Sequence, residues 1–158
     1  MAKTSVPKAV LLDGAQMALA GMCAGMMGFL KERQIPAREM IAYIGEMFEG
    51  SLGDLEGEPV TDVMEHLLTL QILPMGAEII SSQGTADRAE ARLTSLPSRS
   101  LMEKFGTTPE ELLEGFDITM EEFASLYAMY EPAAEAIGLV FKHRLQDGEE
   151  VISLERRP

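Results

Sequence analysis

The side chains best suited to acid–base chemistry lie near the end of the chain. Apolar and polar residues alternate over residues 139–145, which predicts a strand with Phe141 and His143 on its apolar face. A histidine there could act as a general acid or base, although a structural histidine bonded to a neighbouring carboxylate gives the same pattern. Tyr130 and Glu131 lie on a predicted helix just before this strand. We therefore take His143, Tyr130 and Glu131 as candidate catalytic residues, with a structural role as the alternative.

The sequence indicates no metal site and identifies no cofactor. His66 and His143 are its only histidines, and it lacks the Glu-x-x-His pairs that bind iron in helical bundles. The single cysteine, Cys23, lies among Met, Ala and Gly residues, where no charge would lower its pKa. No glycine-rich segment follows a predicted strand and opens a helix, as a phosphate-binding loop would.

The charge balance argues against a nucleic-acid partner. The 158 residues include 26 acidic and 13 basic side chains, for a net charge of -13. Contacts with phosphate groups need a basic surface, so we expect no binding to nucleic acid. A single cysteine cannot form a disulfide framework, which is typical of proteins from a reducing compartment. We therefore expect a cytoplasmic protein.

Methionine is the most unusual feature of the composition. The chain has twelve methionines and no tryptophan. Flexible thioether side chains fill irregular gaps in cores, and they also line adaptable hydrophobic binding sites. An ordinary methionine-rich core is the alternative interpretation. The candidate ligand-binding residues are large apolar or aromatic side chains on predicted inner faces, together with the histidine: Met22, Met26, Phe29, Met47, Tyr127, Tyr130, Phe141 and His143.

The apolar segment from Val10 to Leu30 is the centre of the predicted fold. Its larger side chains recur at alternating spacings of three and four residues, the pattern of an apolar helix face. They form the stripe Leu12, Ala15, Leu19, Met22, Met26 and Phe29. A second stripe has almost no side-chain bulk and predicts the close approach of another backbone: Gly14, Ala18, Gly21, Gly25 and Gly28. The third side is also mostly apolar, so we expect this helix to be buried on nearly every side.

We do not expect this helix to cross a membrane. Its uncharged run, residues 14–30, is shorter than the roughly 18 to 20 residues that a transmembrane helix needs. The run is also rich in the weakly hydrophobic residues Ala and Gly. Close packing within or between protein chains is the better explanation of its glycines.

Two further helices are predicted in the first half of the chain. Residues 36–48 carry an apolar stripe that includes Met47, and residues 60–73 carry one that includes Leu70. The glycine-punctuated acidic segment 50–59 between them is predicted to be a solvated loop.

The second half is predicted to contain two hairpins. Alternating segments at 75–82 and 89–96 form the first hairpin, and Asp147-Gly148 is the turn of the second. Between them, a capping box at Thr119 begins a helix that Pro132 is expected to kink.

These elements predict an α+β fold. Helices would pack on one face of a mostly antiparallel sheet built from two hairpins, with a helix-rich N-terminal half. We expect a single domain over residues 1–158, with a loose lead-in at 1–8.

Three functions are compatible with this sequence. The first is a non-catalytic, dimeric protein that binds or senses a small hydrophobic ligand. The second is an enzyme that acts on a small substrate through His143, Tyr130 and Glu131. The third is a homo-oligomeric assembly or interaction protein whose glycine stripe is the contact between subunits. A solid interior without a cavity would exclude the first function, and the second requires that its three side chains converge within hydrogen-bond reach. Unchanged dimers in a Gly21→Leu variant would count against the third.

Overall fold

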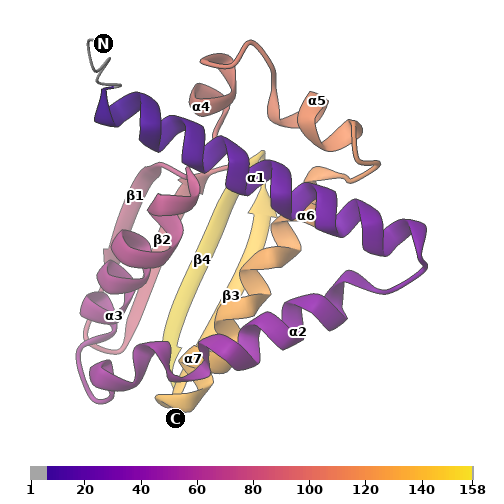
Figure 1. Ribbon diagram of the computed structural model, residues 1–158. Helices are drawn as coiled ribbons and strands as arrows, with labels where there is room; N and C mark the ends of the chain where they lie inside the picture. Colours follow the sequence, from indigo (N-terminus) through magenta and orange to yellow (C-terminus); the bar gives the residue numbers. More distant parts are fainter. Residues whose placement is uncertain (1–6, 158) are drawn as a thin grey trace, which may run out of the picture.

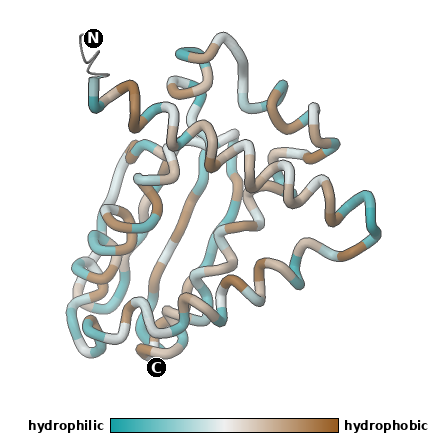
Figure 2. Tube along the Cα trace, in the orientation of Figure 1, coloured by the Kyte–Doolittle hydropathy of each residue, from teal (hydrophilic) through white to brown (hydrophobic). Residues whose placement is uncertain are grey.

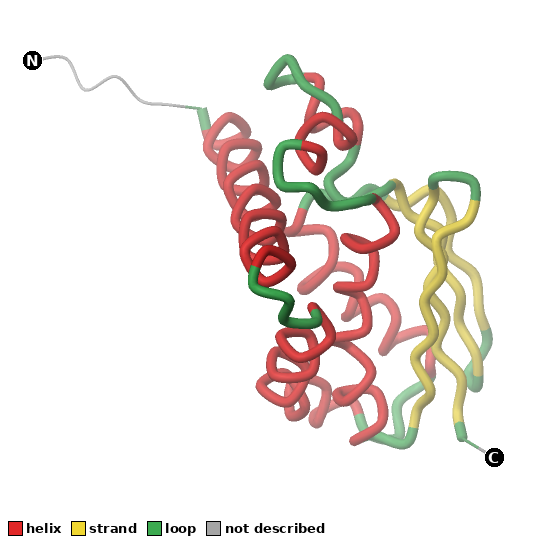
Figure 3. The backbone as a smooth tube through the Cα atoms, turned by 90° about the vertical axis from the view of Figure 1, so that its right-hand side faces the viewer, coloured by secondary structure: helices red, strands yellow, loops and turns green. Residues whose placement is uncertain are grey.

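The two predicted hairpins form one antiparallel sheet. The computed structural model describes residues 7–157, and Figure 1 shows the sheet behind the helices. β1 (Ile79–Gly84) pairs with β2 (Arg88–Thr94), and β3 (Leu139–Gln146) pairs with β4 (Glu149–Arg156). Pairing of β2 with β4 joins the hairpins in the strand order β1-β2-β4-β3. The predicted α+β fold is confirmed, with helices packed on one face of the sheet (Figure 3).

Backbone geometry explains the turn of the second hairpin. Asp147 and Gly148 connect β3 to β4 with φ angles of 54° and 80°. A two-residue turn with positive φ at both positions matches the twist of antiparallel strands, and Asp-Gly adopts it at low cost. The predicted position of this turn is confirmed.

Both faces of the central strand β4 are covered. Toward the helices, Ile152 and Leu154 are fully buried opposite Ala91 and Ala89 of β2. The other face carries long charged side chains that pair between strands: Arg88–Glu155, Lys142–Glu155, Arg92–Glu149 and Arg144–Glu90. The alkyl parts of such side chains cover apolar neighbours while their charged ends stay in water. This face therefore needs no further layer of protein.

The helices form two layers on the sheet (Figure 3). α3 (Val60–Leu67) packs on β2 and β4, while the 3-10 segment η4 (Ser125–Tyr130) and α7 (Glu131–Ala136) pack on β3. α1 (Lys8–Glu32) and α2 (Ala37–Phe48) lie farther from the sheet. α2 packs on η4 and α7, while α1 contacts α2 and the segments Leu73–Met75, Arg99–Glu103 and Pro109–Glu114. The outer layer is thus made by the first two helices of the chain.

Threonine caps start two short helices, and the cap at Thr119 is at the predicted position. Thr108 caps α5 (Pro109–Glu114) and Thr119 caps α6 (Met120–Ala124). In both, the threonine Oγ1 accepts a hydrogen bond from the backbone N–H of a glutamate three residues on, and that glutamate accepts one in return. A further short helix, α4 (Arg99–Glu103), precedes them.

The predicted long, kinked helix before β3 is instead three segments, α6, η4 and α7. Pro132 lies in the first turn of α7, where its missing N–H costs no helical hydrogen bond. Gly138, with a φ of 77°, follows α7 and leads into β3.

α1 has its predicted length, but the prediction that it is buried on nearly every side is wrong. Only Ala20, Ala24, Met27 and Gly28 are buried. The inward face is the third side of the helix, where small residues allow close packing on the inner layer. Ion pairs fasten this side near both ends of the helix: Asp13–Lys104 at 2.9 Å and Lys31–Glu122 at 3.1 Å. Of the predicted lead-in, residues 1–6 lie outside the described residues and Lys8 already belongs to α1.

The stripe of large side chains on α1 faces solvent. Its exposed fractions range from 38% to 64% at Leu12, Leu19, Met22, Met26 and Phe29. Figure 2 shows hydrophobic residues along this outer helix as well as in the interior. All three sides of α1 are apolar, so hydrophobic spacing could not decide which of them packs inward. Asp13 and Lys31, which form ion pairs with the rest of the protein, lie on the inward side.

Part of the glycine stripe is used for packing within the chain. A Cβ atom at Gly28 would lie 2.7 Å from the carbonyl oxygen of Phe116, and one at Gly25 would lie 3.4 Å from the Phe116 ring. Gly14 and Gly21 face open space. The stripe as a whole is therefore not a free contact surface for a second subunit.

α2 also packs through a small residue. Gly45 is buried, and a Cβ atom there would lie 2.9 Å from Cγ of Pro132. Met47, predicted to point inward, is 70% exposed, because the face centred on Gly45 makes the contact. The predicted loop after α2 is instead a 3-10 segment, η1 (Glu49–Leu55), with Leu52 buried.

A π-helical turn follows α3. The predicted helix over residues 60–73 is α3 followed by the π-helical segment η2 (Leu68–Ile72) and the short 3-10 segment η3 (Leu73–Met75). A wider turn shifts the following side chains out of the 3.6-residue pattern. As a result Leu68 and Ile72 are buried, whereas Leu70, predicted to point inward, is 61% exposed.

The contact at Gly28 predicts opposite effects for two similar substitutions. Gly28→Ala places a methyl group 2.7 Å from a backbone oxygen, so we expect the free energy of unfolding to fall by about 1–3 kcal/mol. Gly21→Ala meets open space and should raise it by up to about 1 kcal/mol through better helix propensity. Urea-induced unfolding measures both changes. Equal stability of the two variants would contradict the close contact.

Candidate functional site

An apolar groove lies between α1, α2 and the inner layer. Its volume is about 390 Å³. Four separate segments line it: Leu19, Cys23 and Met26 of α1; Met40, Ile44 and Phe48 of α2; Leu70, Gln71, Pro74 and Met75 of η2–η3; and Leu126, Met129 and Tyr130 of η4. Four of the twelve methionines are among these residues.

Close backbone contacts elsewhere hold this groove open. Gly45 brings α2 against Met129 and Pro132, so the larger residues Met40 and Ile44 lie beside the contact rather than in it. The π-helical turn η2 places Leu70 and Gln71 at the groove. Such turns occur often at functional sites because they displace side chains from the regular helical pattern.

The polar groups in the groove are neutral. Burial raises the pKa of the Tyr130 phenol well above its ordinary value, and its Oη donates a hydrogen bond to Sδ of Met75 at 3.5 Å. Burial likewise raises the pKa of the Cys23 thiol. No Asp, Glu, Lys, Arg or His is among the described residues that line the groove.

Gln71 supplies the one strong hydrogen-bond acceptor without a partner at this groove. Its Nε2 donates to Oγ of Ser51 at 3.4 Å, while its Oε1 is buried and accepts no hydrogen bond from the described residues. A buried amide oxygen without a donor costs free energy, and this oxygen is not accessible from the groove. The surface of the groove is therefore apolar and uncharged.

The predicted ligand-binding residues fall into three places. Met26 and Tyr130 line the groove. Met22, Phe29 and Met47 lie on the outer surface of α1 and α2, with exposed fractions of 64%, 52% and 70%. Tyr127, Phe141 and His143 belong to the inner layer and the sheet, outside the groove lining.

Sequence reasoning missed most of the groove. The density of methionine could have pointed to Met40, Met75 and Met129. No pattern in the sequence marks Leu70 or Gln71, because their placement depends on the π-helical turn.

His143 belongs to a buried polar cluster behind the groove. Its Nε2 lies 2.6 Å from Oε2 of Glu150, which is 1% exposed. The Tyr127 ring stacks on the imidazole with 4.8 Å between ring centroids. Burial, and secondarily the charge of Glu150, raise the pKa of the Tyr127 phenol, whose Oη has no hydrogen-bond partner among the described residues.

The candidate catalytic residues are not joined by this arrangement. His143 bonds to Glu150, Tyr130 bonds to Met75, and Glu131 is exposed at the start of α7. Within residues 7–157, no hydrogen bond links any two of His143, Tyr130 and Glu131. A histidine paired with a carboxylate is the structural alternative that the sequence left open.

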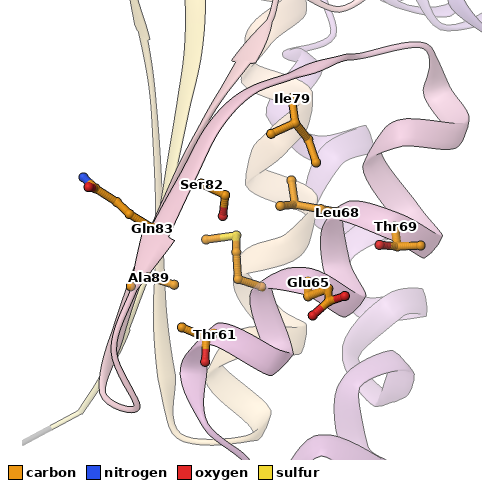
Figure 4. A pocket seen from close by; sticks show the side chains of 10 residues that line it. Thr61, Glu65, Leu68, Thr69, Ile79, Ser82, Gln83 and Ala89 are labelled. Carbon is orange, nitrogen blue, oxygen red and sulfur yellow. The ribbon is translucent and has the colours of Figure 1, made fainter.

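A second cleft, between α3 and β1, has a different character (Figure 4). Its volume is about 370 Å³, and its lining combines Met64 and Leu68 with polar side chains such as Thr61 and Ser82. None of the predicted site residues lines it. In the part of the chain that the structure describes, no hydrogen bond pairs a nucleophile with a base in this cleft. The lining of this cleft therefore indicates a class of ligand or reaction less clearly than the lining of the groove does.

Neither cleft has the ligands of a metal site. Among the described residues, no group of three or more His, Cys, Asp or Glu side chains is placed to hold a metal ion. Comparison with known proteins finds no family model, curated protein or solved structure that matches this chain. The choice of candidate site consequently depends on geometry and chemistry.

The raised pKa of Cys23 predicts slow alkylation at neutral pH. The thiolate is the reactive form, so the rate constant with iodoacetamide should rise with a midpoint above the ordinary value of about 8.5. The same measurement on the protein in denaturant should return the ordinary midpoint. A native midpoint at or below the denatured one would show that Cys23 is not in an apolar environment.

The His143–Glu150 pair predicts strong coupling in a double-mutant cycle. Either Glu150→Met or His143→Phe alone leaves a buried polar group without its partner and should cost about 1–3 kcal/mol of unfolding free energy. The double variant should recover much of this loss. The exposed pair Arg92–Glu149 is the matched control, with an expected coupling below about 1 kcal/mol. Additive effects at His143 and Glu150 would contradict a structural pair.

Proposed function

We propose that this protein binds a small, uncharged hydrophobic molecule in the groove between α1 and α2. The observation that carries the proposal is the lining, which combines four methionines with aliphatic and aromatic side chains and no charged residue. A volume of about 390 Å³ is within the roughly 300–1,000 Å³ of small-molecule sites.

The lining also limits the chemistry of the ligand. An ionic group would lose its hydration without gaining a counter-charge, which opposes binding of acids and amines in their charged forms. Thioether side chains adapt to varied shapes, so recognition would depend on polarity and size more than on one fixed outline.

Binding or sensing without catalysis is the proposed role. Cys23 and Tyr130 are the ionisable groups at the groove, and burial favours the neutral form of both. Neither is hydrogen-bonded to a base in the described chain. His143, the strongest acid–base candidate in the sequence, is paired with Glu150 outside the groove lining.

Two matched substitutions on α2 test the proposal. Ile44 lines the groove, whereas Met47, one helical turn along, does not. Ile44→Trp should fill part of the groove and raise the dissociation constant of a neutral fluorescent dye such as Nile red by at least about tenfold. Met47→Trp should leave it within about twofold, with circular dichroism confirming that both variants fold. Equal dye affinity in the two variants would show that the groove is not the binding site.

Native mass spectrometry of protein purified from cells provides a second readout. We expect a bound small molecule that is released on unfolding and that is reduced in the Ile44→Trp variant. A bound mass that is unchanged by Ile44→Trp would place the ligand elsewhere.

A further inference from the structure

The outer face of α1 is built like one half of a helix pair. Its solvent-facing side chains follow the spacing 3-4-3-4-3 over eighteen residues, which is the spacing of a coiled-coil seam. We call this set the α1 seam: Leu12, Ala15, Leu19, Met22, Met26 and Phe29. A seam with this spacing packs against another helix at a crossing angle near 20°.

The same face lacks charge, although the protein as a whole is strongly acidic. Between Lys8 and Lys31, the one charged residue of α1 is Asp13, and it points inward to Lys104 at 2.9 Å. The solvent-facing part of the helix between these lysines is therefore uncharged, in a chain with a net charge of -13. A partner of opposite charge would have no group to recognise there, whereas two copies of this face meet without repulsion.

We infer that the α1 seam is the contact between two copies of this chain, which lie antiparallel across a two-fold axis near residues 20 and 21. In this register every layer of the seam joins a smaller or shorter side chain to a larger one. The layers are Leu12 with the partner's Phe29, Ala15 with the partner's Met26, and Leu19 with the partner's Met22. A parallel pair would instead place Phe29 against the partner's Phe29 and Ala15 against the partner's Ala15.

The two ends of α1 do not decide the orientation. In this register Lys8 lies opposite the partner's Arg33, whereas a parallel pair would place Lys8 against the partner's Lys8, so like charges meet at the helix ends in either arrangement. Ala18 borders the seam and leaves room for the partner's backbone, whereas the neighbouring Gly25 packs against Phe116 of its own chain.

The exposed apolar area of this face approaches that of a small dimer interface. Six large apolar side chains on the seam side of α1 are 38% to 64% exposed: Leu11, Leu12, Leu19, Met22, Met26 and Phe29. At roughly 100 Å² each, about half of what an aromatic side chain buries, they offer at most on the order of 600 Å². Standard interfaces take about 600–1,000 Å² from each partner, so this face meets the lower end of the range. The largest apolar patch on a monomeric protein is about 300–600 Å² and is often functional.

A lipid surface fits this face less well. α1 is long and apolar enough to cross a membrane by length and composition, a test that helices of soluble proteins and signal sequences also pass. Helices that lie on membranes carry Lys and Arg along the polar face. Here the inward side of α1 forms ion pairs with the rest of the protein through Asp13 and Lys31. The protein as a whole is acidic, so anionic lipids would repel it.

The dimer would also complete the groove. Leu19 and Met26 belong both to the α1 seam and to the groove lining, so a second copy on the seam would cover the groove on its outer side. The inference about the dimer does not depend on the proposed ligand, since the seam is defined by residues of α1 alone.

Sedimentation equilibrium of the full chain over a range of concentrations tests the dimer. The wild type should sediment as a species of twice its 17.3 kDa mass. Met22→Glu should raise the dimer dissociation constant by roughly 100-fold or more, because the two-fold axis buries the new charge twice. Ile80→Glu on β1 is the matched control, since Ile80 is 49% exposed and lies on the sheet edge, and it should leave the dimer unchanged.

A charge-pair variant tests the orientation. Combining Leu19→Lys with Met22→Glu should restore dimers relative to Met22→Glu alone, because each introduced lysine then faces the partner's introduced glutamate. In a parallel pair, like charges would face each other and the double variant would remain monomeric. That result would overturn the antiparallel register.

Other outcomes would overturn the inference as a whole. A wild type that stays monomeric at all concentrations, or a Met22→Glu dimer as tight as the wild type, excludes the seam as a contact between copies. Co-sedimentation of monomeric wild type with vesicles of phosphatidylcholine and phosphatidylglycerol, lost in Met22→Glu, would assign the face to a membrane. Dye affinity in Ile44→Trp reports on the groove separately, so failure of the dimer and failure of the ligand site are distinguishable.

Discussion

Contact through small residues determines how the two outer helices lie on the rest of the protein. α1 packs through Ala20, Ala24 and Gly28, and α2 packs through Gly45. Where glycine meets a carbonyl oxygen or a proline ring, the backbones come closer than any larger residue would allow. Because these contacts use the smallest side chains, most of the larger apolar residues of both helices lie elsewhere, with Met27 and Ile41 as the buried exceptions. The others form the walls of the groove and the outer face of α1.

Fold class was readable from the sequence because each hairpin carries its own local signals. Alternation over residues 89–96 correctly predicted a strand, in which Ala89, Ala91 and Leu93 are buried, and Asp147-Gly148 correctly marked a turn. These signals act over a few residues and do not depend on the rest of the chain. The orientation of α1 could not be read in the same way, since size and hydrophobicity favoured the stripe that faces solvent. Two features set the orientation of α1. One is the close contact of Gly28 with Phe116, and the other is a pair of ion pairs with residues far away in the sequence.

The candidate site was less predictable than the fold. Its lining comes from four segments that only the tertiary structure brings together, and one of them is a π-helical turn. Of the predicted ligand-binding residues, Met26 and Tyr130 are in the groove, although the helix face that carries Met26 was expected to be buried and is largely exposed. His143 was correctly placed on the apolar face of its strand, yet its partner Glu150 was not foreseen. β4 has polar residues at both ends, so the sequence does not show that Glu150, unlike its neighbours, is buried.

α1 is attached to the rest of the molecule by few strong interactions. The residues that it buries are mostly alanine and glycine, which contribute little apolar area, and its two ion pairs are largely exposed, where such pairs are worth about 0–1 kcal/mol each. Native-state hydrogen exchange divides proteins into cooperative units of unequal stability, and elements with few buried apolar contacts open first. By this criterion we expect α1 to open at a lower free energy than the sheet and the helices packed on it. Since α1 is also a wall of the groove, local opening of this helix would change the shape of the groove on a microsecond to second timescale.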